Sequence, residues 1–421
     1  MNSPILSLAL GRRVAVTTLA LAILATPFAS AAEAAITKPY QPKNKVALAP
    51  GIKFSVGTMK TTGGRPQSVR VGTIETRHES VHLKAVLSNE KVVWREIVTR
   101  MAKRKSRPSR RAMVATNGDM SMRNRVDAYA APHSMAVGNR ELMVAQTCVR
   151  PTLGVDPDGD ARIGMVRADI SVVPPGKNQP RRIHRVNTHR DDRLTVLFTQ
   201  RFGPSTKTAG GGVEVILQLE DTLRPKGVQR VKVLKVRSGK GDTTLRSGQA
   251  VLSVKDPNTK WVYRLRVGQR FDLTTRIVRK ANHPCGSSVR EATDWSGISE
   301  AQGGNYFTAR GSKVAAPSKA VYLPGTQRHP RTNVGITADG RVLMVTVDGR
   351  RTKSVGVTLA EMGQLMISLG ATHAFNLDGG GSTVMARRML GSGTFEVSNK
   401  PSDGRQRPAT QSLVAFDLDP S

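Results

Sequence analysis

Residues 342–381, VLMVTVDGRRTKSVGVTLAEMGQLMISLGATHAFNLDGGG, carry the clearest secondary-structure signals of the chain. The run VLMVTV (Val342–Val347) is apolar on both faces, which predicts a buried strand that ends at Asp348. A helix is predicted next, because Thr358 and Glu361 have the spacing of a capping box and leucines and methionines follow at helical intervals.

A second strand, HAFNL (His373–Leu377), is predicted after the helix and ends at Asp378. If the two strands are parallel neighbours joined by a right-handed crossover, Asp348 and Asp378 lie side by side at one edge of the sheet. Upstream, the apolar run AMVAT (Ala112–Thr116) also ends in a polar cluster, which contains Asp119. Three such strand ends predict one cleft.

An internal repeat extends this layout to the rest of the chain. Arg150–Ile163 aligns without gaps to Arg331–Met344, with identical residues at four positions, and each segment reads as strand, turn and strand. Between them, residues 187–320 contain short β-like runs, LTVLFTQ, VEVILQL, RVKVLKV and KWVYRLRV. The predicted fold class is α+β (mixed α/β), with duplicated β-rich halves around a central sheet, packed helices, and a β-rich insert at about 187–320.

The N-terminal residues predict an export signal. Arg12 and Arg13 precede an apolar run, and Ala29-Ser30-Ala31 is a typical cleavage site. We therefore expect a signal peptide at 1–31, a linker at 32–55 and the functional domain at 56–421, and a protein that is secreted or held in the cell envelope.

The net charge is strongly positive. It is +34 for the whole chain, with 65 Lys+Arg against 31 Asp+Glu, and such a charge favours anionic glycans or anionic surfaces as partners. Aromatic residues make up only 4% of the chain, so stacking platforms for nucleic acid are scarce and no nucleic-acid partner is expected. The oligomeric state cannot be read from the sequence.

Two cysteines, Cys148 and Cys285, allow one disulfide in an oxidising compartment. No common metal-binding motif occurs, so no cofactor is required by the sequence. A divalent cation remains an alternative, because clustered Asp and Asn oxygens are hard ligands.

The residues at the strand ends suit a sugar phosphodiester. Carboxylates gathered in a cleft can act as acid, base or nucleophile at an anomeric carbon. The run Gly379–Gly381 either forms a tight turn or lets backbone N–H groups approach a phosphate together with Ser382. Arg331 could hold the same phosphate through its planar guanidinium, and His329 could donate a proton near neutral pH.

Three stretches together resemble the phosphodiester glycosidase family: RHPRTNVGITADGRVLMVTVDGR, TLAEMGQLMISLGATHAFNLDGGGSTVM and VSNKPSDGRQRPATQSLVAF. The resemblance is close from about Gln327 to Phe416 and weaker upstream, where TNGDM, SMAVGNRELMVAQ and the GG of EAQGGNYF match. By matching motifs, it implies a site made of Asn117, Asp119, His329, Arg331, Thr332, Asp348, Asn376, Asp378, Gly379, Gly380, Gly381, Ser382, Ser402, Asp403 and Arg407.

The resemblance implies hydrolysis of the bond between a sugar's anomeric carbon and a phosphodiester oxygen. Asp378 is then the nucleophile or the electrostatic partner of the transition state, and Asp348 or Asp119 is the acid/base. Arg331 and the glycine N–H groups hold the phosphate. Two alternatives stay open on the sequence: a non-catalytic binder of envelope polyanions, and a metal-dependent phosphodiesterase that acts at phosphorus.

Overall fold

The computed structural model describes residues 35–123, 130–255, 260–279, 293–315 and 325–418. The predicted signal peptide therefore lies outside the described residues. Cys148 is disulfide-bonded, whereas Cys285, the only other cysteine of the chain, lies outside them. No helix within the described ranges has the length and apolar character that crossing a membrane requires.

The predicted α+β fold class is wrong, because the chain is mostly β. Strands hold 50% of the described residues and helices only 8%. The helices are α1 (Val98–Lys105), α2 (Lys260–Tyr263) and α3 (Leu359–Ser368), with short 3-10 turns η1 (Ser88–Glu90) and η2 (Gly380–Ser382). The one strong helical pattern in the sequence led the prediction to expect more helices of the same kind.

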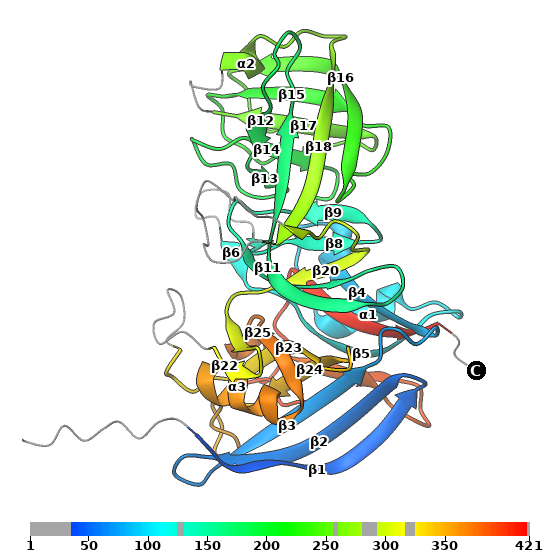
Figure 1. The fold of residues 1–421 in the computed structure, drawn as a ribbon, viewed down its shortest axis with the longest axis vertical. Helices are drawn as coiled ribbons and strands as arrows, with labels where there is room; N and C mark the ends of the chain where they lie inside the picture. Colours follow the sequence, from blue (N-terminus) through cyan, green and yellow to red (C-terminus); the bar gives the residue numbers. More distant parts are fainter. Residues whose placement is uncertain (1–34, 124–129, 256–259, 280–292, 316–324, 419–421) are drawn as a thin grey trace, which may run out of the picture. The chain divides into compact units, whose positions relative to one another are not determined.

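An eight-stranded sheet holds the segment with which the sequence argument began (Figure 1). Its strands, in spatial order, are β1 (Ile36–Ala49), β2 (Ile52–Thr61), β3 (Arg65–Ile74), β24 (Val342–Val347), β23 (Arg331–Thr337), β25 (Ala371–Asn376), β21 (Phe307–Arg310) and β22 (Lys313–Val314).

A second sheet has 13 strands and includes most of the predicted insert. Its main path is β13 (Arg185–Val186), β14 (Val196–Thr199), β17 (Gln249–Val254), β15 (Val213–Gln218), β16 (Gly227–Ser238), β18 (Arg270–Arg279), β11 (Ala161–Val172), β10 (Arg150–Val155), β20 (Glu300–Gly303), β8 (Ala136–Gly138) and β9 (Glu141–Val144). Two further strands pair at its sides, β12 (Arg181–Ile183) with β11 and β19 (Thr293–Asp294) with β18.

A five-stranded sheet carries the third predicted strand end. Its order is β27 (Phe395–Val397), β26 (Met385–Arg388), β5 (Arg111–Asn117), β28 (Gln411–Asp417) and β4 (Val81–Leu87). A small ribbon pairs β6 (Ser121–Arg123) with β7 (Ala130–Pro132). One apolar cluster joins β5 and β25, and it includes Val114, Phe375, Leu377 and Met385, all fully buried.

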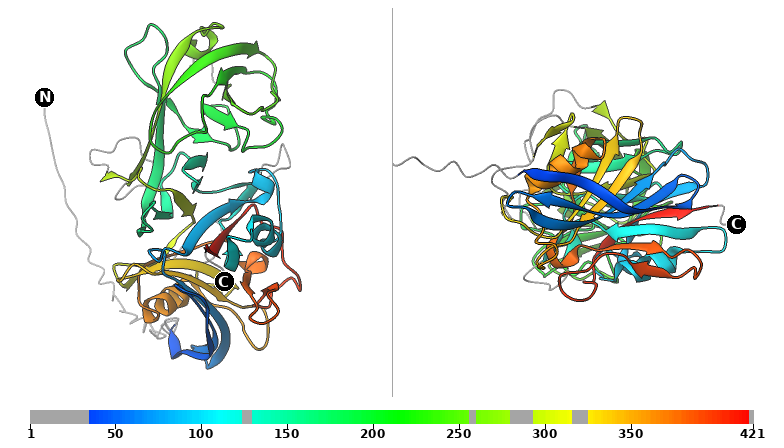
Figure 2. Two further views of the ribbon diagram at one scale, coloured as in Figure 1. Left: turned by 90° about the vertical axis from the view of Figure 1, so that its right-hand side faces the viewer. Right: turned by 90° about the horizontal axis from the view of Figure 1, so that it is seen from below.

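The predicted helix is confirmed in detail. The side chain of Thr358 accepts a hydrogen bond from the backbone N–H of Glu361, and the carboxylate of Glu361 accepts one from the backbone N–H of Thr358. Gly370 follows the helix with a φ of +92°, the left-handed conformation expected of a residue that ends a helix. Helix α3 packs against β1, β21, β22 and β25 (Figure 2).

The neighbouring placement of β24 and β25 is not what the structure shows. Both strands are antiparallel to β23, which lies between them, so they run in the same direction but do not pair. The reason is that β23 and β24 form a hairpin, so β24 occupies one side of β23. The chain then crosses over through α3, and β25 pairs with the other side of β23. Asp348 and Asp378 therefore follow strands that are two positions apart.

Both segments of the internal repeat are hairpins in the same register. Leu153 pairs with Ile163 in β10–β11, and Val334 pairs with Met344 in β23–β24. Each turn contains a glycine with positive φ, +84° at Gly159 and +86° at Gly340. Each hairpin also pairs with a later strand, β10 with β20 and β23 with β25.

One strand prediction in the insert is wrong. KWVYRLRV forms α2 and a following turn instead of a strand. Val262 and Leu265 are the buried residues of this run, and a separation of three positions is helical spacing. The alternation of polar and apolar letters in this run was therefore misleading.

Candidate functional site

The site forms where β5 and β25 end. β5 leads into Gly118 and Asp119, and β25 leads through Leu377 into Asp378. The two loops are held together by a hydrogen bond of 3.0 Å from Asp378 N to Gly118 O. A Cβ atom at Gly118 would lie 2.5 Å from Gln411 Cγ, so this approach requires glycine.

Asn117 positions these loops and does not face a ligand. Its Nδ2 donates to the backbone oxygens of Asp378 and Gly118, at 2.8 and 3.2 Å. Its Oδ1 accepts from Thr332 Oγ1 at 2.8 Å and from Val384 N at 3.1 Å. Asn117 and Thr332 are both buried, so their hydrogen-bonding groups are used within the protein.

Asp119 is a buried carboxylic acid. Its side chain is 3% exposed; Oδ1 accepts from Met120 N at 2.7 Å and from Asn305 Nδ2 at 3.2 Å. Oδ2 accepts no well-formed hydrogen bond from the described residues. Burial raises the pKa of Asp119 to about 7, and the hydroxyl of Ser134, the N–H of Met120 and the charge of Arg150 only partly oppose this rise.

A chain of side chains, which the sequence argument missed, orients Asn305 toward Asp119. Arg150 Nη2 lies 3.1 Å from His133 Nε2, and His133 Nδ1 lies 3.1 Å from Asn305 Oδ1. Since Arg150 can only donate, Nε2 accepts and Nδ1 carries the proton. Burial and Arg150 lower the pKa of His133, which favours this neutral ring. The SMAVGN and GGN segments were noted as family-like motifs, but nothing in their spacing indicates this connection.

Asp378 is the more accessible carboxylate of the pair. It is half-buried, and Gly379 N donates to its Oδ1 at 2.8 Å. Burial raises the pKa of Asp378, while Ser382, Gly379 and the charges of Arg407 and Arg95 act in the opposite direction. Asp378 also raises the pKa of Asp119, so the two carboxyl groups interact. Because like charges repel, this interaction disfavours the state in which both carboxyl groups are charged.

The raised pKa predicts how stability depends on pH. Above pH 3.8 the unfolded chain releases the Asp119 proton, whereas the folded chain keeps it up to about 7. The proton-linked stability is therefore lost as pH rises from about 4 to about 7. An Asp119→Asn variant lacks this loss, so its free energy of unfolding in urea should rise relative to that of the wild type as pH increases from about 4 to about 7. Asp158→Asn, at an exposed turn, is the control, and equal pH slopes for Asp119→Asn and the wild type would contradict the assignment.

The glycine run serves close packing more than backbone donation. Gly379 N donates to Asp378, Gly380 N donates to Pro330 O at 2.9 Å, and Ser382 N donates to Gly379 O at 3.2 Å. Gly380 has a φ of +61°. The N–H groups of Gly379, Gly380 and Ser382 are therefore already used within the protein, and the predicted role of the run in holding a phosphate stays a prediction.

Arg407 and Asp403 lie directly against this loop. Arg407 Nε and Nη2 donate to Asp403 Oδ2 at 2.9 and 2.7 Å. A Cβ atom at Gly381 would lie 2.1 Å from Arg407 Nη2, so the absence of a side chain there admits the ion pair. Arg407 is 47% exposed and acts on the charge of Asp378, which makes its guanidinium available to an anion beside that carboxylate.

Arg331 is completely buried. Its Nε and Nη2 donate to Val357 O and Gln327 O at 3.2 and 3.0 Å, and Nη1 has no partner among the described residues. Burial, followed by the charge of Arg350, lowers the pKa of Arg331 to about 10. With no exposed surface, Arg331 does not reach a ligand in this conformation.

His329 lies next to two guanidinium groups. Arg350 Nη2 is 3.4 Å from His329 Nδ1, and Arg350 is exposed beside Gly380. Burial, Arg331 and Arg350 lower the pKa of His329, so its ring is mainly neutral at pH 7 and a poor proton donor. Arg350 was not selected from the sequence.

Asp348 is engaged in a buried ion pair. Arg70 Nη1 donates to its Oδ2 at 2.5 Å, and both side chains are almost fully buried. Asn399 Nδ2 and Lys400 N donate to Oδ1, each at 3.1 Å. No hydrogen bond or ion pair within the described ranges joins Asp348 to Asp378. Its acceptor positions are occupied, which favours Asp119 over Asp348 as the proton donor.

Two other residues selected from the sequence, Asn376 and Ser402, have polar side-chain atoms buried within the protein. Asn376 is buried, and its Nδ2 donates to Leu377 O. Ser402 Oγ is buried without a hydrogen-bond partner among the described residues. No cluster of three His, Cys, Asp or Glu residues suited to a metal occurs in the part of the chain that the structure describes.

Fold and site together define a β-rich protein with two interacting carboxyl groups beside exposed arginines, which is an arrangement suited to hydrolysis at an anomeric carbon next to a phosphate. The match to known families agrees. Residues 277–416 match the family model described as phosphodiester glycosidase. This confirms the family predicted from the sequence motifs.

The relatives are distant or partial. A Bacillus subtilis (strain 168) protein derived from the SPbeta prophage, YomE, is 40% identical over 108 residues, which are 26% of this chain and 16% of that protein. A Synechocystis protein is 16% identical with a TM-score of 0.69, over 90% of this chain and 64% of its own. A Burkholderia pseudomallei K96243 protein is 19% identical with a TM-score of 0.63, over 84% and 74%. These two structures show the fold alone.

Proposed function

We propose that the chain hydrolyses the bond between a sugar's anomeric carbon and a phosphodiester oxygen, releasing free sugar and leaving a phosphomonoester. The observation that carries the proposal is that Asp119 and Asp378 follow two strands whose loops are joined by the hydrogen bond from Asp378 N to Gly118 O. One is buried with a pKa raised to about 7, and the other is half-buried at the end of β25. Two carboxyl groups in different environments can divide the roles of acid and anion.

In the proposed reaction, Asp119 donates its proton to the departing phosphate oxygen. Asp378, as the carboxylate, stabilises the positive charge that develops at the anomeric carbon or attacks it directly. Asn305 holds Asp119 in place through the hydrogen bond to Oδ1. Water supplies the hydroxyl group of the released sugar.

The phosphate is held by Arg407 and Arg350 in this proposal. Both are exposed, and they lie against Gly381 and Gly380 respectively. Arg331, buried behind Gly379, adds positive potential from within the protein without contacting the substrate. The proposal therefore assigns phosphate binding to these two exposed arginines instead of to Arg331, because a phosphate can reach them.

We further propose that the chain acts outside the cytoplasm on a glycan that carries phosphodiester groups, with N-acetylglucosamine as the first sugar to test. The sequence features that support export are the Arg12-Arg13 pair, the apolar run after it and the small residues before Ala32. The high positive charge supports an anionic glycan as the substrate.

The test is product identification with UDP-N-acetylglucosamine as substrate. Free N-acetylglucosamine together with intact UDP, detected by mass spectrometry, is the expected result. N-acetylglucosamine 1-phosphate and UMP would place the attack at phosphorus and overturn the proposal, and a parallel reaction with a chelator would then examine metal dependence. No product from any sugar phosphodiester of a small panel, combined with retained polyanion binding, would favour a binding protein.

A further inference from the structure

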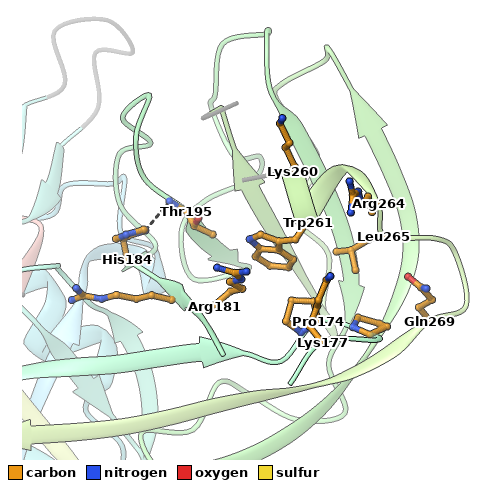
Figure 3. A pocket seen from close by; sticks show the side chains of 12 residues that line it. Pro174, Lys177, Arg181, His184, Thr195, Lys260, Trp261, Arg264, Leu265 and Gln269 are labelled. Carbon is orange, nitrogen blue, oxygen red and sulfur yellow. Dashed lines mark hydrogen bonds between the residues drawn. The ribbon is translucent and has the colours of Figure 1, made fainter. Parts of the chain in front are cut away.

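A second cavity lies in the insert, away from the residues of the candidate active site. Its volume is about 450 Å³, and it is lined by residues that follow β11, by β12 and by α2 (Figure 3). This volume falls within the range of roughly 300–1,000 Å³ that is typical of small-ligand sites. None of its lining residues belongs to the site around Asp119 and Asp378.

The lining is cationic and has no acidic residue. None of the five basic residues forms a salt bridge with a residue that the structure describes, although many arginines elsewhere in the chain do. Arg182 is the most buried of them; its Nη2 has no hydrogen-bond partner among the described residues, and burial lowers its pKa. The five are Lys177, Arg181, Arg182, Lys260 and Arg264.

One aromatic residue completes the cavity. Trp261, in α2, is half-buried, packs partly against the core of the insert and also lines the cavity. Figure 3 shows Trp261 between Lys260 and Arg181 in that view. Because the indole packs partly against the core, it offers a flat apolar surface to a sugar ring at a small cost in conformational entropy.

We infer that this cavity binds a sugar unit bearing a phosphate or carboxylate group, with the ring on Trp261 and the anion on the basic residues. The inference does not depend on the proposed catalytic function, since the two sites share no residue. A neutral sugar would leave five unpaired cations without a partner. A bare anion would leave the indole unused.

The test uses titration calorimetry on the full chain carrying Asp378→Asn, so that turnover does not consume the ligand. N-acetylglucosamine 1-phosphate is the probe, with N-acetylglucosamine and inorganic phosphate as comparison ligands. The sugar phosphate should bind best, and Trp261→Ala should weaken it about tenfold. Trp94→Ala, at a tryptophan that is 50% exposed outside the cavity, is the matched control.

A second pair of variants keeps the test valid if Trp261→Ala does not fold. Lys260→Ala should weaken sugar-phosphate binding up to about fivefold, whereas Lys235→Ala, an exposed lysine of β16, should not. Unchanged binding in both Trp261→Ala and Lys260→Ala would overturn the inference. Equal affinity for inorganic phosphate, or for the neutral sugar, would also overturn it. A polymer such as a phosphodiester-linked glycan would show the same pattern with higher affinity if its repeat units are the natural ligand.

Discussion

An Asp378→Asn variant should lose at least about a thousandfold in kcat toward a sugar phosphodiester while keeping its fold. The amide has nearly the same shape, but it cannot carry the negative charge that the transition state requires. Asp378 N and O take part in the loop contacts through the backbone, and these do not change with the substitution. Rate measurements and near-UV circular dichroism check the two halves of this expectation.

The matched control is Asp339→Asn. Asp339 lies in the turn between β23 and β24, is exposed, and pairs with Arg341 at the surface. We expect wild-type rates from it, because its side chain contacts Arg341 at the surface and, within the described residues, none of those around Asp378. An active Asp378→Asn enzyme would end the assignment of Asp378, whereas equal losses in both variants would point to a general effect on the fold.

An Arg70→Met variant should lose about 3–5 kcal/mol of stability toward urea. Arg70 and Asp348 are 8% and 2% exposed, so removing the guanidinium leaves a buried carboxylate without its counter-charge. Methionine keeps much of the apolar part of the arginine side chain but none of its donors. Asp348 would then keep only the hydrogen bonds from Asn399 and Lys400.

Arg77→Met is the corresponding surface change. Arg77 pairs with Asp160, but both side chains are more than half exposed, so less than about 1 kcal/mol is expected. A loss in Arg70→Met no larger than in Arg77→Met would show that Asp348 is not held as a buried charge. In that case its exclusion from proton transfer would need to be reconsidered.

The sequence predicted the elements that local patterns determine. The two-sided apolar run of β24, the capping box of α3 and the hairpin turns at Gly159 and Gly340 all have short-range causes, and all were found. The pairing of strands was harder, because β23 was not expected between β24 and β25. Helix α1 was missed, since half of its residues are basic and only Val98, Met101 and Ala102 are buried.

A site residue could be predicted where the residues next to it in the sequence indicate its role. Asp378, followed by three glycines, is such a case. The choice between Asp119 and Asp348 as proton donor could not be predicted. It depends on the ion pair of Asp348 with Arg70, which lies 278 residues earlier in the sequence. In the same way, His133 and Arg150 reach Asp119 only through Asn305, and no spacing along the chain indicates a connection made across two sheets.

The shared register of the two hairpins places Asn305 and Asp378 at equivalent points. Thr152 pairs with Gly303 and its counterpart Asn333 pairs with Asn376, so two residues further along the chain come Asn305 and Asp378. Two copies of one structural unit thus end at the same site, one with an amide side chain and the other with an acid. Had both ended in aspartate, three acidic groups would compete for protons around one centre. In the proposed reaction, the difference between the copies separates the two roles: Asn305 orients the proton donor Asp119, and Asp378 supplies the negative charge.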